Sequence, residues 1–376
     1  MSITIKRFDE LSAADKEQWN QWAAPSGQLI SPYLRAEFAG TIARYRDDVR
    51  IAVLEQDGTT NGYFAHHTPQ NGVLRPVGAP MSDYQGAVIR PGARAHPTDF
   101  LKATGSSAIV YDNWFCPLGG VKSARRERDG SVVVDLSAGA DAYFSAQRSQ
   151  FKDHFKKTAR RLRAAERDFG PARVEIGDPC GSAFDQLVAW KRQQYRDTAK
   201  LDVMGIDWVM NVLDHLQQSS ENGFGGLTAA LWFGDRLAAV EFGIQADGVY
   251  HSWFPAYDPE LAKYSPGLLL MHGIFEQAQD MGLNRVDLGR GGQHYKKYYA
   301  SYEVPLDQGR VLTSGFAALA IYGWEAAEKA AQVMPERVAD IPARLRRRWA
   351  QVSAYERRLG PRLASMALAM RQPQAA

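Results

Sequence analysis

The sequence predicts a mixed α/β protein that consists of two similar halves and a helical C-terminal extension. Three observations lead to this prediction. The chain has 376 residues, which at roughly 100–200 residues per domain suggests two domains. Each half has helical patterns followed by a hairpin, with its turn at Asp57-Gly58 or Gly234-Asp235, which suggests a distant duplication. From about Gly315 onward the sequence has only helical patterns.

Composition and charge indicate an ordinary globular protein. Hydrophobic residues make up 45% and charged residues 23% of the chain, which excludes a disordered or fibrous class. The net charge of +3 is too small to imply nucleic-acid binding by itself. The charge is unevenly distributed, because residues 143–170 hold eight Lys and Arg against three Asp and Glu, and residues 311–376 hold ten against five. We therefore expect an anionic partner to meet these two basic segments first.

The sequence also indicates the compartment. The two cysteines, Cys116 and Cys180, lie far apart and exclude a disulfide framework, and no known metal-binding motif occurs. The first residues become charged before an apolar run could serve as a signal peptide. The longest uncharged stretch, 311–324, is shorter than the roughly 20 residues of a membrane span. We therefore expect a cytoplasmic protein without a bound metal.

The first half combines helical patterns with short strands. Alternating apolar residues flank Asp57-Gly58, a dipeptide that favours the tight turn of a hairpin. The expected elements are helices at 14–23 and 32–45, hairpin strands at 50–54 and 62–66, a second strand pair at 72–77 and 86–90, and a strand at 132–136.

Residues 143–169 are predicted to form one long basic helix. Apolar and small side chains recur every three or four residues from Phe151 to Phe169, which defines one helix face. Gly170-Pro171 ends the helix. A stripe of basic residues runs beside the apolar face: Lys152, Lys156, Arg160, Arg163 and Arg167.

The second half contains a helix with clear signals at both ends. Ser265 suits the N-cap position, Pro266 the first helical position, and Gly282 the position just past the C-terminus. The expected elements are helices at 184–195, 206–218 and 266–281, and strands at 227–233, 236–245, 249–254 and 285–288.

Four stretches of the second half occur together in a specific order: Trp253-Phe254-Pro255-Ala256-Tyr257-Asp258, Lys263-Tyr264-Ser265-Pro266-Gly267, Asp287-Leu288-Gly289-Arg290-Gly291 and Tyr295-Lys296. With these stretches the region 227–300 resembles the FemAB-like, CelD-type branch of the GNAT acetyltransferases, which are encoded with bacterial exopolysaccharide genes. The first half, with Ser82-Asp83-Tyr84 and Arg160-Arg161-Leu162, is similar to the degenerate N-terminal half of that branch. The resemblance implies tandem GNAT-like folds with mixed sheets, in which the second fold binds acyl-CoA. The expected domains are a degenerate GNAT-like domain at 1–142, a basic connecting helix at 143–170, a GNAT acetyltransferase domain at 171–310, and a basic helical extension at 311–376.

The start of the helix at Pro266 is the expected binding site of the acyl donor. A helix N-terminus offers unpaired N–H groups and a partial positive charge, both of which favour a diphosphate. The alternative is a well-capped helix without a ligand. The usual GNAT phosphate loop, Gln/Arg-x-x-Gly-x-Gly/Ala, has more glycines than residues 263–268, and FemAB-type relatives that use aminoacyl-tRNA share this departure. Acetyl-CoA and aminoacyl-tRNA therefore both stay open as donors. The residues expected to contact the donor are Phe254, Tyr264, Ser265, Pro266, Gly267, Leu268 and Lys296.

Four side chains are candidates for the chemistry of acyl transfer to an amine. This reaction needs a base for the amine, hydrogen-bond donors for the oxyanion, and an acid for the leaving thiolate. Backbone N–H groups at 254–256 can supply the donors where the strand splays as in GNAT folds. Glu241, His251 and Asp287 are the candidate bases, and Tyr295 follows where GNAT folds often place the acid. The structural alternatives are a salt-bridged Glu, a core His, an Asp that orders a turn and a packed Tyr.

Two further groups of residues are candidates for binding other molecules. Trp253, Tyr257, Asp258 and Arg290 are candidate substrate-binding residues, with core packing as the alternative for the aromatic side chains. Arginine side chains match phosphate groups and stack on purines, which makes the Arg344–Arg348 segment a candidate site for a regulatory cyclic dinucleotide. Its alternatives are a solvated face and, with Trp349, contact with the inner face of the inner membrane. The regulatory candidates are Arg344, Arg346, Arg347 and Arg348.

These observations predict an N-acetyltransferase that moves an acetyl group from acetyl-CoA to an amino sugar of an exopolysaccharide or its lipid-linked precursor. Cyclic di-GMP is its candidate regulator, through the basic C-terminal segment. The first alternative is a FemAB-like aminoacyltransferase that uses aminoacyl-tRNA. The second is a non-catalytic, nucleotide-binding effector on a GNAT scaffold.

Overall fold

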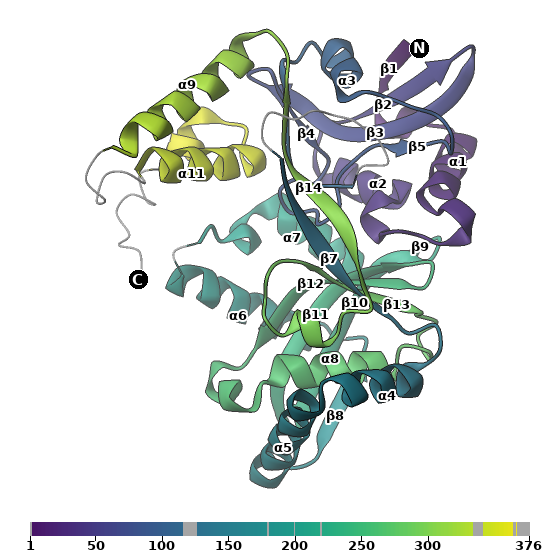
Figure 1. Ribbon diagram of the computed structural model, residues 1–376, viewed down its shortest axis with the longest axis vertical. Coiled ribbons are helices and arrows are strands. Elements are labelled where there is room, and N and C mark those ends of the chain that lie inside the picture. Colours follow the sequence, from purple (N-terminus) through teal and green to yellow (C-terminus); the bar gives the residue numbers. More distant parts are fainter. Residues whose placement is uncertain are drawn as a thin grey trace.

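The computed structural model describes residues 2–115, 126–178, 180–198, 200–218, 220–333, 341–363 and 366. The strands of these residues form one continuous mixed sheet that runs the length of the molecule (Figure 1). The first half of the chain lies at one end of the sheet, the second half at the other, and the C-terminal helices lie beside the first half.

The two halves repeat one strand order. In each half, neighbouring strands are antiparallel except for the last pair, which is parallel. This repeated topology is what the expected duplication requires. The order in the first half is β1 (Ser2–Lys6), β2 (Val49–Gln56), β3 (Thr59–Gln70), β4 (Val73–Pro76) and β6 (Ala108–Trp114). The order in the second half is β8 (Ala172–Ile176), β10 (Phe224–Phe233), β11 (Arg236–Ala246), β12 (Val249–Tyr257) and β13 (Arg285–Arg290).

Two long strands join the halves by crossing between them. β7 (Arg126–Asp135) belongs to the first half of the chain but pairs with β13, and β14 (Tyr302–Leu312) belongs to the second half but pairs with β6. β7 and β14 also pair with each other, as Figure 1 shows in the middle of the molecule. Because each half contributes a strand to the other, the sheet has no break at which the halves separate.

Helices cover both faces of the sheet. In the second half, α6 (Ser182–Asp197) and α7 (Asp207–Gln218) share a core with Val240 and Phe242 on one face. α4 (Ala140–Gln150), α5 (Lys152–Phe169) and α8 (Pro266–Glu276) share a second core with Ala239 on the opposite face. The remaining helices of the described residues lie with the first half: α1 (Ala13–Ala23), α2 (Ala36–Tyr45), α3 (Pro97–Thr104), α9 (Phe316–Ala331) and α11 (Ile341–Tyr355).

One predicted hairpin is confirmed, whereas one strand pairing and the bounds of two helices differ from the prediction. The hairpin around Asp57 and Gly58 is confirmed, because both residues have the positive φ of a type I′ turn. The second strand pair is wrong, because β4 and β5 (Val88–Ile89) both pair with β3 instead of with each other. The predicted helix at 32–45 is interrupted at Arg35, whose ψ of 146° is extended. The helix predicted for 266–281 ends at Glu276 and continues as turns to Gly282.

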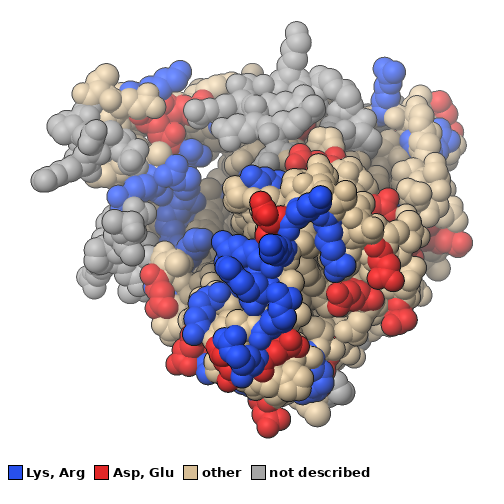
Figure 2. All heavy atoms as spheres, turned by 60° about the horizontal axis from the view of Figure 1, so that its bottom comes forward, with Lys and Arg blue, Asp and Glu red and all other residues tan. Residues whose placement is uncertain are grey.

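The predicted basic helix is in fact two helices. Phe151 adopts φ −125° and ψ 49°, which ends α4 and begins α5, and its ring packs edge-on against Tyr298. The basic stripe itself is confirmed, because Lys152, Lys156 and Arg160 are exposed along α5. Figure 2 shows the Lys and Arg side chains gathered over this end of the molecule. No helix among the described residues combines the length and the apolar composition that a bilayer-spanning segment requires.

Candidate active site

The parallel pair β12–β13 separates in the middle of the second half. The two strands pair only over Val249–Arg285, Tyr250–Val286 and His251–Asp287. Beyond this point β12 continues beside β11, whereas β13 continues beside β7. A bulge at Trp253 bends β12 just after the last pair, between the residues opposite Phe242 and Gly243. The edge of β12 that faces β13 therefore has no strand partner beyond His251, and Pro255, in the middle of the predicted donors at 254–256, has no N–H to donate.

On one face of this opening, a buried histidine links two carboxylates. His251 Nε2 lies 2.9 Å from Asp83 Oδ2, and His251 Nδ1 lies 3.5 Å from Asp287 Oδ1. His251 and Asp287 are completely buried, whereas the side chain of Asp83 is 31% exposed. Tyr33 packs edge-on against the imidazole ring. The three side chains thus form a line from the interior of the sheet to the surface.

The charges of this line follow from its contacts. Burial lowers the pKa of His251, but the carboxylates of Asp287 and Asp83 outweigh it and raise the pKa to about 9. Burial also opposes ionisation of Asp287, but His251, Ser131 and Tyr84 together hold the pKa of its carboxyl below the usual value. This raised pKa favours a cationic His251 between the two carboxylates at neutral pH, which argues against its predicted role as base.

Asp287 is held by a full set of donors. Its Oδ1 accepts hydrogen bonds from Ser131 Oγ (2.5 Å) and from the backbone N–H of Gly289 (2.8 Å), and its Oδ2 accepts one from Tyr84 Oη (2.6 Å). A carboxylate in this state is a poor proton acceptor, so we assign Asp287 a positioning role instead of the predicted role as base. The alternative that Asp287 orders the turn at 289–291 is confirmed by the Gly289 hydrogen bond.

On the opposite face, Glu241 is the candidate base that the structure supports best. Glu241 is buried in β11, on the face that packs against α8. Burial raises the pKa of its carboxyl, although Ser252, Tyr250 and Lys191 act in the other direction. Burial lowers the pKa of Lys191 to about 8. A buried carboxylic acid with a raised pKa is suited to accept and release a proton near neutral pH.

Tyr295 lies on the same side of the sheet as Glu241. It is partly buried against the core that includes α8, and burial together with Glu241 raises the pKa of its hydroxyl to about 12. The predicted catalytic residues thus divide into two pairs: Glu241 with Tyr295, and His251 with Asp287.

The start of α8 is open, but it is not capped as predicted. Ser265 adopts the left-handed conformation (φ 57°), and its side chain makes no capping hydrogen bond. Only its carbonyl takes part, by accepting hydrogen bonds from the N–H groups of Leu268 and Leu269. A Cβ added to Gly267 would meet nothing within 4 Å, so the first turn faces open space. The other predicted donor contacts, Phe254, Tyr264 and Pro266, are buried, and Leu268 is partly buried.

The C-terminal end of α5 lies beside this helix start. Tyr264, just before α8, donates a hydrogen bond of 2.5 Å to Asp168 near the end of α5. Lys263 Nζ lies 4.7 Å from the ring centre of Tyr264. An anion at the start of α8 would therefore meet both helix N–H groups and basic side chains.

Several predicted binding residues instead hold the fold together. Lys296 is buried and donates hydrogen bonds to the carbonyls of Gly289 (2.9 Å) and Arg290 (3.1 Å), so it is not placed to neutralise a phosphate. Asp258 accepts hydrogen bonds from Arg236 and from the N–H of Glu260. Arg290 donates to the carbonyl of Asp112 and to Gln308.

The predicted aromatic contacts differ in exposure. The indole of Trp253 donates a 3.0 Å hydrogen bond to the carbonyl of Met81 and packs against the core. This is the core packing given above as the alternative to substrate binding. Tyr257, at the end of β12, is 46% exposed and is available to a ligand. Sequence reasoning missed Asp83, Tyr84 and Ser131 as parts of the site. The Ser82-Asp83-Tyr84 stretch was a signal for the first two, but only as a point of resemblance.

Comparisons with known proteins agree with this geometry. Residues 152–297 match the family described as an acetyltransferase (GNAT) domain. Among solved structures, FemX superposes with a TM-score of 0.52 at 10% sequence identity, over 86% of this chain and 99% of that chain. A conserved protein of unknown function from Bacteroides thetaiotaomicron VPI-5482 gives a TM-score of 0.52 at 8% identity, over 83% and 100% of the two chains. A search of curated proteins gave no significant match. Residues 152–297 are therefore similar to a GNAT acetyltransferase domain, and the chain as a whole has a mixed α/β fold like that of FemX.

Proposed function

We propose that the protein is an N-acetyltransferase that transfers an acetyl group from acetyl-CoA to the amine of an amino sugar in an exopolysaccharide or its precursor. The observation that carries this proposal is the separation of β12 from β13 directly after His251 and Asp287. In this separation an edge of β12 without a strand partner lies between the start of α8 on one face and a partly exposed carboxylate, Asp83, on the other.

The donor would bind along β12 with its diphosphate at the start of α8. The first-turn N–H groups there and the basic stripe of α5 supply complementary charge. The thioester would then lie in the opening between the strands, where backbone N–H groups of β12 beside the Trp253 bulge would stabilise the oxyanion.

The side chains on the two faces would divide the proton transfers. Asp83, oriented by the cationic His251, would hold the acceptor, whose ammonium group first releases one proton to solvent through this partly exposed carboxylate and so becomes the free amine. Glu241 would take the proton that the amine loses as its nitrogen bonds to the acetyl carbon. As the carbon–sulfur bond breaks, Tyr295 would donate a proton to the leaving thiolate. The amino-sugar class rests on the resemblance of the motifs in residues 227–300 to the CelD-type branch, together with this carboxylate.

Calorimetry and a transfer assay test the proposal. We expect acetyl-CoA to bind the full chain with one site, and glucosamine or its oligomers to be acetylated on the amine, as mass spectrometry would show. Absence of acetyl-CoA binding by a chain with a normal circular dichroism spectrum would overturn the proposal. Acetyl-CoA binding without acetylation of any amino sugar would contradict the acceptor class alone.

Substitutions of Gly267 test whether the diphosphate of the donor binds at the start of α8. We expect Gly267→Asp to raise the KM for acetyl-CoA about tenfold, because a carboxylate at the helix start repels a diphosphate. The same change should leave thermal stability unchanged or slightly higher, since acidic side chains are favourable in the first turn of a helix. Gly267→Ala is the matched control, because open space surrounds the added Cβ. Equal KM values in both variants would place the diphosphate elsewhere.

A second candidate function is aminoacyl transfer from charged tRNA, which is favoured by α5. Six Lys and Arg side chains of α5 have no carboxylate partner in the described part of the chain: Lys152, Lys156, Lys157, Arg160, Arg161 and Arg163. Such a stripe suits a nucleic-acid backbone, whose binding weakens steeply with salt. A gel shift with total tRNA that is lost at high salt and in Lys156→Glu/Arg160→Glu would favour this function. No retention of tRNA at low salt would exclude it.

A further inference from the structure

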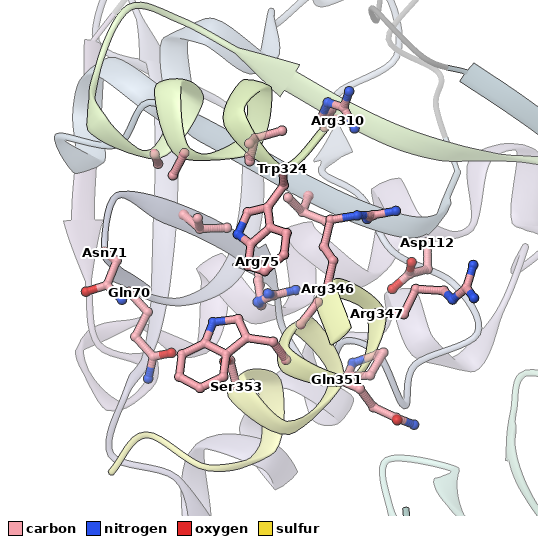
Figure 3. A pocket seen from close by; sticks show the side chains of 18 of the residues that line it. Gln70, Asn71, Arg75, Asp112, Arg310, Trp324, Arg346, Arg347, Gln351 and Ser353 are labelled. Carbon is pink, nitrogen blue, oxygen red and sulfur yellow. The ribbon is translucent and has the colours of Figure 1, made fainter. Parts of the chain in front are cut away.

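A second ligand cavity lies in the first half of the molecule. It has a volume of about 850 Å³ and lies between the sheet and the two C-terminal helices, α9 and α11 (Figure 3). Its floor is formed by β4, β6 and β14, and it holds Arg75 and Asp112 just beyond the point where the parallel pair β4–β6 ends. The cavity therefore occupies the position in the first half that corresponds to the β12–β13 opening in the second.

The cavity has an excess of positive charge. Five arginines line it, against two acidic residues, Asp112 and Glu328. Three of the five are already engaged: Arg310 with Glu325, Arg346 with Glu328, and Arg362 with the carbonyls of Glu356 and Arg357. The other two are Arg75, from β4, and Arg347, from α11. Within the described residues, neither guanidinium makes a hydrogen bond or ion pair, although the nearby carboxylate of Asp112 attracts that of Arg75.

Aromatic and polar side chains complete the cavity. Trp324 projects from α9 and Trp349 belongs to α11, so two indoles line the same space as the arginines. Figure 3 shows Arg75, Trp324, Arg346 and Arg347 around one hollow, with Gln70, Asn71 and Gln351 near its edges. The Oγ of Ser353 is buried at the cavity wall and has no hydrogen-bond partner within the described chain. Buried polar groups usually have a hydrogen-bond partner, so this hydroxyl is free to bind a polar group of a ligand in the cavity.

We propose that this cavity binds a nucleotide with two phosphate groups, held by Arg75 and Arg347 and stacked on the indoles of Trp324 and Trp349. Guanidinium groups match phosphate oxygens, indoles stack on planar bases, and the amide side chains and Ser353 offer hydrogen bonds to the edge of a base or to ribose. The volume is within the range of cavities that enclose ligands of this size.

This site only partly agrees with the arginines singled out in the sequence. Arg346 and Arg347 line the cavity, but Arg344 and Arg348 do not. Arg344 is exposed to solvent, and Arg348 donates a hydrogen bond to Gln351. Arg75 had no sequence signal, because it lies on a short strand more than 250 residues before α11.

The wall of the cavity continues into the candidate active site. Arg290 follows Gly289 directly and donates hydrogen bonds to the carbonyl of Asp112 and to Gln308, both of which line the cavity. Gly289 in turn donates its N–H to Asp287. The nucleotide site and the acyl-donor site are nevertheless separate, because α8 lies in the second half, at the opposite end of the molecule from α9 and α11 (Figure 1).

Calorimetry with the full chain tests the site, with ADP, UDP, GDP and cyclic di-GMP as probes. We expect at least one probe to bind, and Arg347→Gln to weaken that binding at least tenfold because a charge-assisted pair to phosphate is lost. Arg75→Gln and Trp324→Ala should weaken it similarly, while acetyl-CoA binding stays unchanged. Arg344→Gln is the matched control and should bind the probe like the unmodified chain.

Three outcomes would overturn the proposal. The first is that no probe binds a chain that still binds acetyl-CoA. The second is that a probe binds equally well to the unmodified chain and to Arg347→Gln, which is exposed and should fold normally. The third is that inorganic pyrophosphate binds as tightly as the nucleotides, which would show a plain polyanion site without base recognition.

Discussion

Replacing Glu241 with Gln is expected to lower the turnover of acetyl transfer by about 10²- to 10⁴-fold, the usual contribution of a positioned general base. Glu241 is buried on β11, and burial raises the pKa of its carboxyl toward the range in which a base is most effective. The amide of Gln has the same shape but cannot accept the proton of the amine. The KM for acetyl-CoA should stay within about twofold, because the proposed diphosphate site at the start of α8 does not include this side chain.

The pH profile separates this role from a structural one. In the unmodified chain, turnover should rise with pH as Glu241 loses its proton, and this limb should disappear from the residual activity of Glu241→Gln. Glu175→Gln is a suitable control, since Glu175 lies on the edge strand β8, which β10 separates from β11, and among the described residues its ion-pair partner is Arg173 on the same strand. Turnover equal to that of the unmodified chain in Glu241→Gln would remove the role and leave the base unidentified.

The parts of the fold that were predicted correctly are those with local causes. The turn at Asp57-Gly58 needs two residues that tolerate positive φ, and the hairpin follows from that requirement. β14 was missed because its burial is irregular and Pro305 interrupts its pattern. It is stabilised by pairing with β6 and β7, which lie far away in the sequence. Pairing across such distances leaves no periodic signal in a single strand.

The candidate site shows the same limit. Ser265 has the side chain of an N-cap, but the turn before α8 forces it into the left-handed region, where its hydroxyl does not cap the helix. The resemblance brought His251 and Asp287 forward as candidates for the site. It could not show that Asp83, 168 residues before His251, would complete their line of charges. That contact bears on the chemistry, because two carboxylates favour the protonated form of His251 and argue against its use as a base.

The largest effect on stability is expected for Asp287→Asn. Removing one member of a buried charged pair costs about 3–5 kcal/mol, and here His251 would keep only the partly exposed carboxylate of Asp83 as its counter-charge. Urea unfolding at pH 7 should show this loss as a lower free energy of unfolding. Asp280→Asn is the matched control, because Asp280 is exposed in the turns between α8 and β13. This change should alter the free energy of unfolding by no more than about 0.5 kcal/mol.

The dependence of this loss on pH identifies its cause. His251 has a pKa of about 9 in the folded protein and about 6.5 in the unfolded chain, so the folded state holds its proton more tightly. This difference corresponds to about 3 kcal/mol of stability, which is fully present below pH 6.5 and is lost as the pH rises through 9. In Asp287→Asn, His251 loses the carboxylate that contributes most to its raised pKa, and its pKa falls. Stability should therefore depend less on pH between 6.5 and 9. The difference between the two proteins should therefore shrink as the pH passes 9. A difference that stays constant from pH 6 to 10 would mean that Asp287 acts only through its hydrogen bonds to Ser131, Tyr84 and Gly289.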